Sequence, residues 1–171
     1  MVISMKEIDR KKQGKRNRAS GLRFERIVKD DLISKGLFVS KFQSTVDFNF
    51  ENKLDKEIKK NVWKDYIEGK KVPYVLGLQS AKGNRFRART LGFPDFIVWG
   101  IITKNDYTYI KNGPLFDVIG VEAKSDGYLD RIEKAKCKWL LENQIFSSIL
   151  IAKKIKVGRK IVPKYIEFEV K

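Results

Sequence analysis

Three charged residues stand in or beside two apolar stretches, where a β-strand would normally carry hydrophobic side chains. Asp95 directly precedes the run Phe-Ile-Val-Trp, and Glu122 and Lys124 end the later run Val-Ile-Gly-Val-Glu-Ala-Lys. Carboxylate oxygens are the ligands that hard divalent cations prefer, and such a cation activates water and neutralises phosphate charge. Lys124 could orient that water or stabilise developing charge. Because Glu-x-Lys also arises by chance in a Lys-rich chain, a cross-strand ion pair is the alternative.

The residue inventory restricts the metal that such a site could hold. The chain has no histidine and a single cysteine, Cys137. Histidine-based catalytic triads are therefore excluded, and so are zinc sites that need histidine or Cys-x-x-Cys pairs. Asp95 and Glu122 would then be the metal ligands, and oxygen ligands favour Mg²⁺ or Mn²⁺.

The charge balance points to a polyanionic partner. The chain has 37 Lys and Arg residues against 21 Asp and Glu residues, for a net charge of +16. Nucleic acid is the commonest intracellular polyanion, and neutralised phosphates contribute most of its affinity for basic proteins. A ribosome-like or merely soluble basic surface, or one selected for heat resistance, is the alternative.

Length and composition indicate one globular domain inside the cell. The chain has 171 residues, of which 42% are hydrophobic and 12% aromatic. No apolar run of about 18 residues could span a membrane, and the N-terminus lacks a signal-peptide core. The lone Cys137 cannot form an internal disulfide, which indicates a reducing compartment. We therefore expect a cytoplasmic protein with no membrane partner.

The first 19 residues are basic and almost without apolar side chains after Met5. We expect residues 1–19 to form a flexible arm that contacts phosphates, with a solvated tail as the alternative. The basic residues assigned to DNA in this arm are Lys15, Arg16 and Arg18.

A helix capped by Ser20 and ended by Gly36 is predicted next. On it Glu25 recurs with Val28 and Leu32 at the spacing of one helix face, so an acid would share a face with core residues. An ion pair with a neighbouring basic residue at the edge of that face is the alternative reading of Glu25. A strand is predicted to follow this helix.

The segment 50–90 departs from this simple pattern and is predicted to be an insertion. Apolar residues at helical spacing predict a helix within residues 50–70. The later part of the insertion has arginines at alternate positions, which suits a clamp on phosphates, and a solvent-facing hairpin is the alternative. These arginines are Arg85, Arg87 and Arg89.

The second half of the chain predicts two strands with a short Tyr-Thr-Tyr strand at residues 107–109 between them, then a helix and two more strands. In the strand over residues 116–124, alternation places Glu122 and Lys124 on one face. The helix over residues 128–143 carries Lys136 on its apolar face, so this amine points toward the core or the site. The element order predicts an α/β fold with a central mixed sheet flanked by helices, in one domain over residues 20–171.

The order of these motifs resembles that of the PD-(D/E)XK nuclease superfamily. The similar features are Glu25 on a first helix, Gly-Phe-Pro-Asp ending at Asp95, Glu-Ala-Lys at Glu122 to Lys124, and a Trp-bearing helix. The closest branches in appearance are the archaeal Holliday-junction resolvases and the VRR-NUC proteins, including small nucleases of archaeal viruses. Many members have Gln where this chain has Lys136.

The resemblance implies an αβββαβ restriction-endonuclease-like core and Mg²⁺- or Mn²⁺-dependent hydrolysis of DNA. By position it implies that Asp95 and Glu122 bind metal, Lys124 is the catalytic lysine and Glu25 is an auxiliary acid. Ser44 stands near the place of a functional serine in resolvases. Resolvase-like members are usually homodimers, an expectation that the insertion could alter, and a viral member would act in its host's cytoplasm.

Two other functions stay open at this point. One is a non-catalytic basic DNA-binding protein that keeps the nuclease fold, in which the charged residues merely form ion pairs. The other is an RNA-binding accessory factor, because basic arms and stacking aromatics do not distinguish the two sugars.

Overall fold

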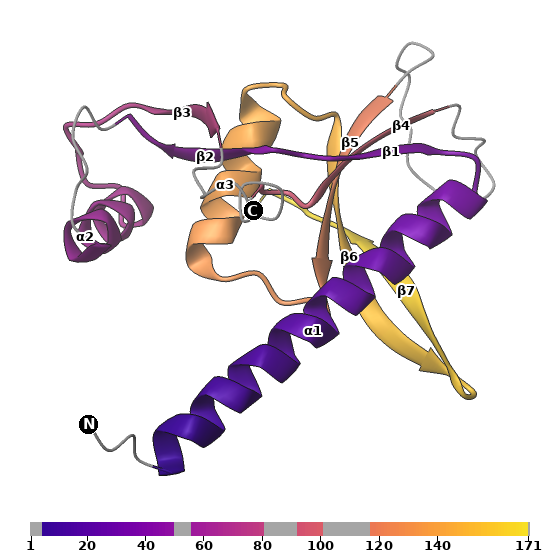
Figure 1. Ribbon diagram of the computed structural model, residues 1–171. Coiled ribbons are helices and arrows are strands. Elements are labelled where there is room, and N and C mark those ends of the chain that lie inside the picture. The colour runs from indigo at the N-terminus through magenta and orange to yellow at the C-terminus, as the bar shows by residue number, and fades with distance from the viewer. Residues whose placement is uncertain (1–4, 50–55, 81–91, 101–116, 171) are drawn as a thin grey trace.

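The computed structural model describes residues 5–49, 56–80, 92–100 and 117–170. Figure 1 shows a sheet with helices on both of its faces and a smaller unit beside it. The elements in chain order are α1 (Met5–Ser34), β1 (Phe38–Lys41), β2 (Ser44–Phe48), α2 (Lys56–Ile67), β3 (Leu76–Ser80), β4 (Phe96–Gly100), β5 (Asp117–Lys124), α3 (Arg131–Glu142), β6 (Ser148–Val157) and β7 (Lys160–Glu167).

Five strands form one mixed sheet in the order β1-β4-β5-β6-β7. β5 and β6 are parallel, whereas the other three neighbouring pairs are antiparallel. A parallel pair cannot be joined by a tight turn, and α3 makes the longer connection that it needs. The predicted α/β fold with a central mixed sheet is confirmed.

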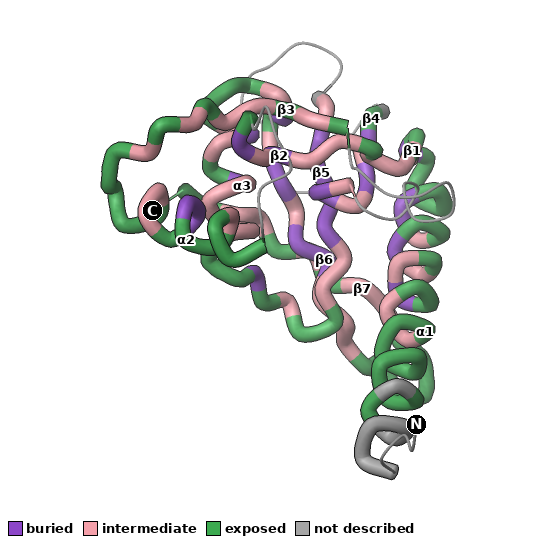
Figure 2. The backbone as a smooth tube through the Cα atoms, turned by 60° about the vertical axis from the view of Figure 1, so that its left-hand side comes forward, coloured by how far each residue is buried: buried purple, intermediate pink, exposed green. Residues whose placement is uncertain are grey.

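The two faces of the sheet are covered by different helices, because successive side chains of each strand point to opposite faces. On one face Val28 and Leu32 of α1 pack with Val121 of β5. On the other face Leu140 of α3 packs with Ile149 of β6. Figure 2 shows the buried residues along both contacts. The flanking of the sheet by helices is therefore as predicted.

The small unit beside the main sheet has its own apolar cluster and begins at β2, before the predicted insertion over residues 50–90. β2 and β3 pair as a separate two-stranded sheet, and α2 lies between them in the chain. Phe48 of β2 packs against Trp63 of α2, and Ile132 and Ala135 of α3 lie against this cluster. The predicted helix is confirmed, but the two strands were not predicted. β2 follows β1 after only two residues, so the two strands read as one stretch.

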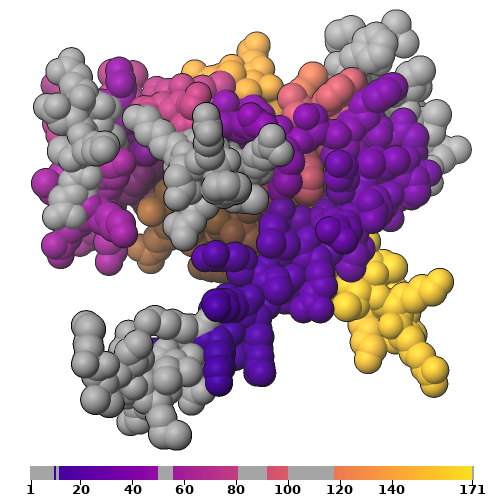
Figure 3. All heavy atoms as spheres, viewed as in Figure 1, coloured from indigo at the N-terminus to yellow at the C-terminus, as the bar shows by residue number. Residues whose placement is uncertain are grey.

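The predicted start of the first helix at Ser20 is wrong, because α1 already begins at Met5. The described part of the predicted arm is helical, since Lys, Arg and Gln are good helix formers and no proline intervenes. This half of α1 has no covering element: residues 12–19 are all exposed, and it stands out from the body of the protein (Figure 3). The end of the helix is as predicted, with Gly36 in the left-handed conformation at φ 79°.

None of the helices in the described ranges is long and apolar enough to cross a membrane.

Gly92 lets two backbone segments approach closely just before Asp95. A Cβ atom at this position would lie 1.5 Å from the carbonyl oxygen of Phe42. The two segments are then joined by hydrogen bonds from the Phe93 N–H to the Ser44 carbonyl and from the Phe42 N–H to the Asp95 carbonyl. Gly92 is therefore needed for the backbone geometry that holds Asp95.

We predict that Gly92→Ala lowers the free energy of unfolding by about 2 kcal/mol or more, because backbone must move to make room for the methyl group. Gly21→Ala is the matched control, since a Cβ there meets nothing within 4 Å and lies in a helix. The control should stabilise by up to about 1 kcal/mol. Urea denaturation followed by tryptophan fluorescence measures both. Equal effects of the two substitutions would contradict the close approach.

Candidate active site

The candidate site lies at one end of the five-stranded sheet. Asp95 directly precedes β4, and Glu122 and Lys124 are among the last three residues of β5. β4 and β5 are antiparallel with Phe96 opposite Val121, so the start of one strand lies beside the end of the other. The strand pairing thus brings together two carboxylates that are far apart in the sequence.

The two carboxylates are held by each other's strands. Glu122 Oε2 accepts a hydrogen bond from the Asp95 N–H at 3.0 Å. Asp95 Oδ2 accepts a hydrogen bond from the Ala123 N–H, also at 3.0 Å. One oxygen of each side chain is therefore anchored to backbone. The other oxygens, Asp95 Oδ1 and Glu122 Oε1, face charged side chains.

A lysine lies beside each of these second oxygens. Lys124 Nζ is 3.4 Å from Glu122 Oε1, and Lys41 Nζ is 3.7 Å from Asp95 Oδ1. Each lysine also binds a further acid: Lys124 donates a hydrogen bond to Glu133 of α3, and Lys41 donates one to Glu25 of α1. The resulting cluster joins four carboxylates with two ammonium groups, and we call it the carboxylate cluster. Its members are Glu25, Lys41, Asp95, Glu122, Lys124 and Glu133.

Burial makes ionisation of the central carboxylates costly. Glu122 is only 6% exposed, and its pKa is raised to about 8 by desolvation and then by the charge of Asp95. The pKa of Asp95 is raised as well, first by burial and then by the charge of Glu25. The pKa of both acids is thus raised even though Lys41 and Lys124 act to lower it, so the lysines balance the charge of this site only in part.

Lys124 is held in its charged form. Burial alone would lower its pKa, but the hydrogen bond to Glu133 and the charge of Glu122 outweigh burial and raise it. Glu133 is itself fixed, because its other oxygen accepts the Asp130 N–H in the capping box of α3. At neutral pH the amine therefore serves as a cation and hydrogen-bond donor rather than as a base.

The donor set fits a small hard cation. Among the described residues no group of three His, Cys, Asp or Glu side chains converges as a metal site. Mg²⁺, however, is usually bound through one or two carboxylates together with waters and substrate phosphates. Asp95 Oδ1 and Glu122 Oε1 would be the ligands, since the partner oxygens are taken by backbone N–H groups.

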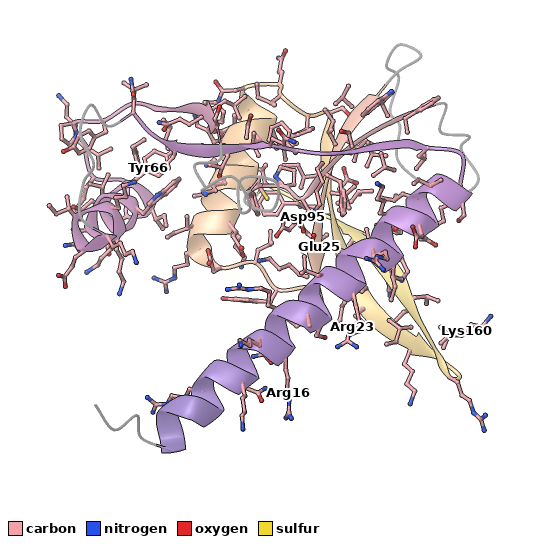
Figure 4. The ribbon with its side chains drawn as sticks, viewed as in Figure 1. Arg16, Arg23, Glu25, Tyr66, Asp95 and Lys160 are labelled. Carbon is pink, nitrogen blue, oxygen red and sulfur yellow. The ribbon has the colours of Figure 1, made fainter. Side chains whose placement is uncertain are left out.

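The structure brings together four of the residues singled out from the sequence. Glu25, Asp95, Glu122 and Lys124 belong to one cluster, and Figure 4 shows Glu25 on α1 next to Asp95. The partner of Glu25 is Lys41, rather than a neighbour on its own helix. Asp31, which also lies on this helix, contacts Tyr165 and Lys35 instead.

Two members of the carboxylate cluster were missed in the sequence. Lys41 follows Leu37 and Val39 at a period of two, so strand alternation could have placed it on the α1 side of the sheet. Glu133 stands three residues after Asp130, and this spacing indicates a helix cap rather than a site residue. Only the fold shows that one oxygen of Glu133 caps the helix while the other holds Lys124.

Lys136 lies on the side of α3 that faces β2, and Ser44 is the first residue of β2. Lys136 donates a hydrogen bond to Thr45 Oγ1 at 3.0 Å, and burial lowers its pKa. Its ammonium is 5.7 Å from the centre of the Trp63 ring. Ser44 begins β2 and uses its carbonyl to bind the Phe93 N–H.

The basic residues of the N-terminal segment that were assigned to DNA lie apart from the carboxylate cluster. Lys15, Arg16 and Arg18 are exposed on the N-terminal half of α1. Arg85, Arg87 and Arg89 lie outside the described residues.

We predict that, without metal, the protein loses stability as pH rises from about 4.5 to about 8. In this window the native Glu122 keeps its proton while the unfolded chain releases it, so rising pH favours unfolding. Each unit of pKa difference corresponds to about 1.4 kcal/mol. Glu122→Gln should flatten the dependence and be more stable than the wild type near the upper end. Urea denaturation in EDTA across this range measures it, and equal slopes for both proteins would contradict the buried acid.

Comparisons of the chain with protein-family models, with curated proteins and with solved structures found no match.

Proposed function

We propose that this protein is a Mg²⁺- or Mn²⁺-dependent DNA endonuclease of the PD-(D/E)XK type. The observation that carries the proposal is the pairing of the buried Glu122 with the partly buried Asp95, anchored through each other's strands, with the Lys124 ammonium 3.4 Å from Glu122. Proteins rarely bury two adjacent carboxylates unless a cation or a proton compensates them. A site of this kind matches the chemistry of phosphodiester hydrolysis.

The order of elements supports the same proposal. When the β2-α2-β3 insertion is set aside, the chain runs α1-β1-β4-β5-α3-β6, followed by β7. This is the αβββαβ order that the resemblance implies. The acids also occupy the expected elements, with Glu25 on the first helix, Asp95 at the start of the second core strand and Glu122 in the third.

In this proposal each residue of the carboxylate cluster has a separate role. Asp95 and Glu122 would hold the metal, which when bound supplies charge neutralisation and an activated water. Lys124, kept protonated by Glu133, would donate hydrogen bonds to the water or to a phosphate oxygen. Glu25 would act indirectly, because its contact with Asp95 is made through Lys41.

The net charge of +16 supports DNA as the substrate. Cleavage could be selective for a junction, a nick or a single strand, in replication, recombination or repair.

A second candidate is a non-catalytic DNA-binding protein with the same fold. The observation that favours it is the pairing of both lysines with acids of other elements, since Lys41 holds Glu25 and Lys124 holds Glu133. In that case the cluster is an ion-pair network that fastens α1 and α3 to the sheet. Metal binding distinguishes the two functions.

We predict that Asp95→Asn, Glu122→Gln and Lys124→Met each lower the cleavage rate at least about hundredfold, because each removes charge from the reacting phosphate's surroundings. Glu142→Gln is the matched control, since it removes an exposed acid of α3 whose partner is Lys138. The assay is cleavage of supercoiled, linear, single-stranded and four-way-junction DNA with Mg²⁺, Mn²⁺ or EDTA. Cleavage that persists in both Asp95→Asn and Glu122→Gln would contradict the proposal.

We also predict that Mn²⁺ binds the wild type and raises its melting temperature, because the metal binds the folded state only. Glu122→Gln should abolish both effects, whereas Glu142→Gln should retain them. Isothermal titration calorimetry and thermal unfolding measure the two quantities. Absence of Mn²⁺ uptake by the wild type, together with salt-sensitive DNA binding, would favour the non-catalytic protein.

A further inference from the structure

Two basic segments that are distant in the sequence project from the same part of the molecule. The first is residues 10–23 of α1, which we call the helix arm, and the second is residues 153–164 of the β6-β7 hairpin, which we call the hairpin arm. Neither segment contains an acidic residue. The basic residues are Arg10, Lys11, Lys12, Lys15, Arg16, Arg18 and Arg23 in the helix arm and Lys153, Lys154, Lys156, Arg159, Lys160 and Lys164 in the hairpin arm.

Each arm has exposed basic side chains. Arg16 and Arg18 of the helix arm are exposed, as are Lys156, Arg159 and Lys160 of the hairpin arm. No salt bridge to a carboxylate is formed by those basic residues of the two arms whose side chains the structure describes. The charge of the arms is therefore not compensated by the described parts of the fold, unlike that of Lys41 and Lys124.

The strand topology directs both arms past one end of the sheet. β6 runs parallel to β5, with Lys153 beside Lys124, the last residue of β5. β6 then continues to Val157, so the hairpin extends about 13 Å beyond β5. Going toward the N-terminus, Phe24 is the last buried residue of α1 among those whose burial is described, and the helix arm then extends about 21 Å from the body.

The two arms leave the body of the protein close to each other and beside the carboxylate cluster. Lys154 Nζ of the hairpin arm lies 5.7 Å from the centre of the Phe24 ring. Phe24 is the residue that directly follows the helix arm in the sequence. Glu25 is the next residue of α1, and Asp95, Glu122 and Lys124 lie at the same end of the sheet. Figure 4 shows Arg16, Arg23 and Lys160 around this end, and Figure 3 shows the described part of the helix arm and the hairpin as two separate projections from the body.

We infer that the helix arm and the hairpin arm together hold duplex DNA by its phosphates, with the duplex passing the end of the sheet that carries the carboxylate cluster. Duplex DNA has one negative charge per about 1.7 Å of its axis, so two long arms free of acid can each contact several phosphates. A bare helix about 10–12 Å wide also fits a major groove of about 12 Å. The inference depends on DNA as the partner in the proposed function but not on catalysis.

The test is DNA binding without cleavage, measured by fluorescence anisotropy in EDTA with a duplex of roughly 30 base pairs between about 50 and 200 mM salt. One variant carries Lys15→Gln, Arg16→Gln and Arg18→Gln, and another carries Lys156→Gln, Arg159→Gln and Lys160→Gln. The control removes the same charge from the exposed face of α2, which lies away from both arms in Figure 1, through Lys56→Gln, Lys60→Gln and Lys64→Gln.

Each arm variant should weaken binding about tenfold or more and lower the salt slope by about two to three, whereas the control should change the slope by less than about one. Circular dichroism and melting temperature check folding, and Arg159→Gln alone gives a milder variant that should show the same direction. Equal losses in the control and arm variants would overturn the inference. So would tighter binding to a duplex of RNA, or arm-dependent binding to phosphatidylserine-phosphatidylcholine vesicles without DNA binding.

The test separates this inference from the proposed function. A protein that binds DNA through both arms but cleaves none of the substrates would contradict the nuclease proposal and support the inference. Cleavage that is equally efficient in the wild type and both arm variants at moderate salt would contradict the inference alone.

Discussion

The enclosure of two carboxylates at one end of a sheet, Glu122 buried and Asp95 partly buried, is the constraint on which the rest of the structure depends. A buried acid must find hydrogen-bond donors, a cation or a proton, because leaving its charge unsolvated is too costly. Asp95 and Glu122 take one backbone N–H each from the neighbouring strand, which is possible only because β4 and β5 are antiparallel and in this register. The close approach at Gly92 then fixes the segment that leads into Asp95.

The remaining charges come from elements that cover the sheet. Lys41 of the edge strand β1 links Asp95 to Glu25 of α1, and Lys124 links Glu122 to Glu133 of α3. The network therefore reaches helices on both faces of the sheet. These contacts position the acids, and they also mean that a shift of either helix would change the electrostatics of the carboxylate cluster. An acid-rich centre is thus held by a scaffold that is strongly basic elsewhere.

The distribution of the basic residues follows from the same topology. Lysines near the carboxylates are paired with acids, whereas the lysines and arginines of the two arms have no acidic residue in their own segments. Charges that stay unpaired repel one another, so a surface of this kind gains stability from a polyanion that screens them. The two arms extend from the end of the sheet at which the acids lie. This is because β6 continues beyond the last residue of β5, and α1 continues beyond the part of the helix that packs on the sheet.

Local patterns in the sequence determined the fold class, the shared face of Glu122 and Lys124, the helix containing Lys136 and the restriction to oxygen ligands. Periodicity and residue inventory are properties of short segments, so they could be read without the fold. Tertiary structure alone decided that Lys41 and Glu133 join the carboxylate cluster and that β2 leaves the main sheet. These outcomes depend on strand order and on which surfaces are covered, because an ion pair forms only where separate elements meet.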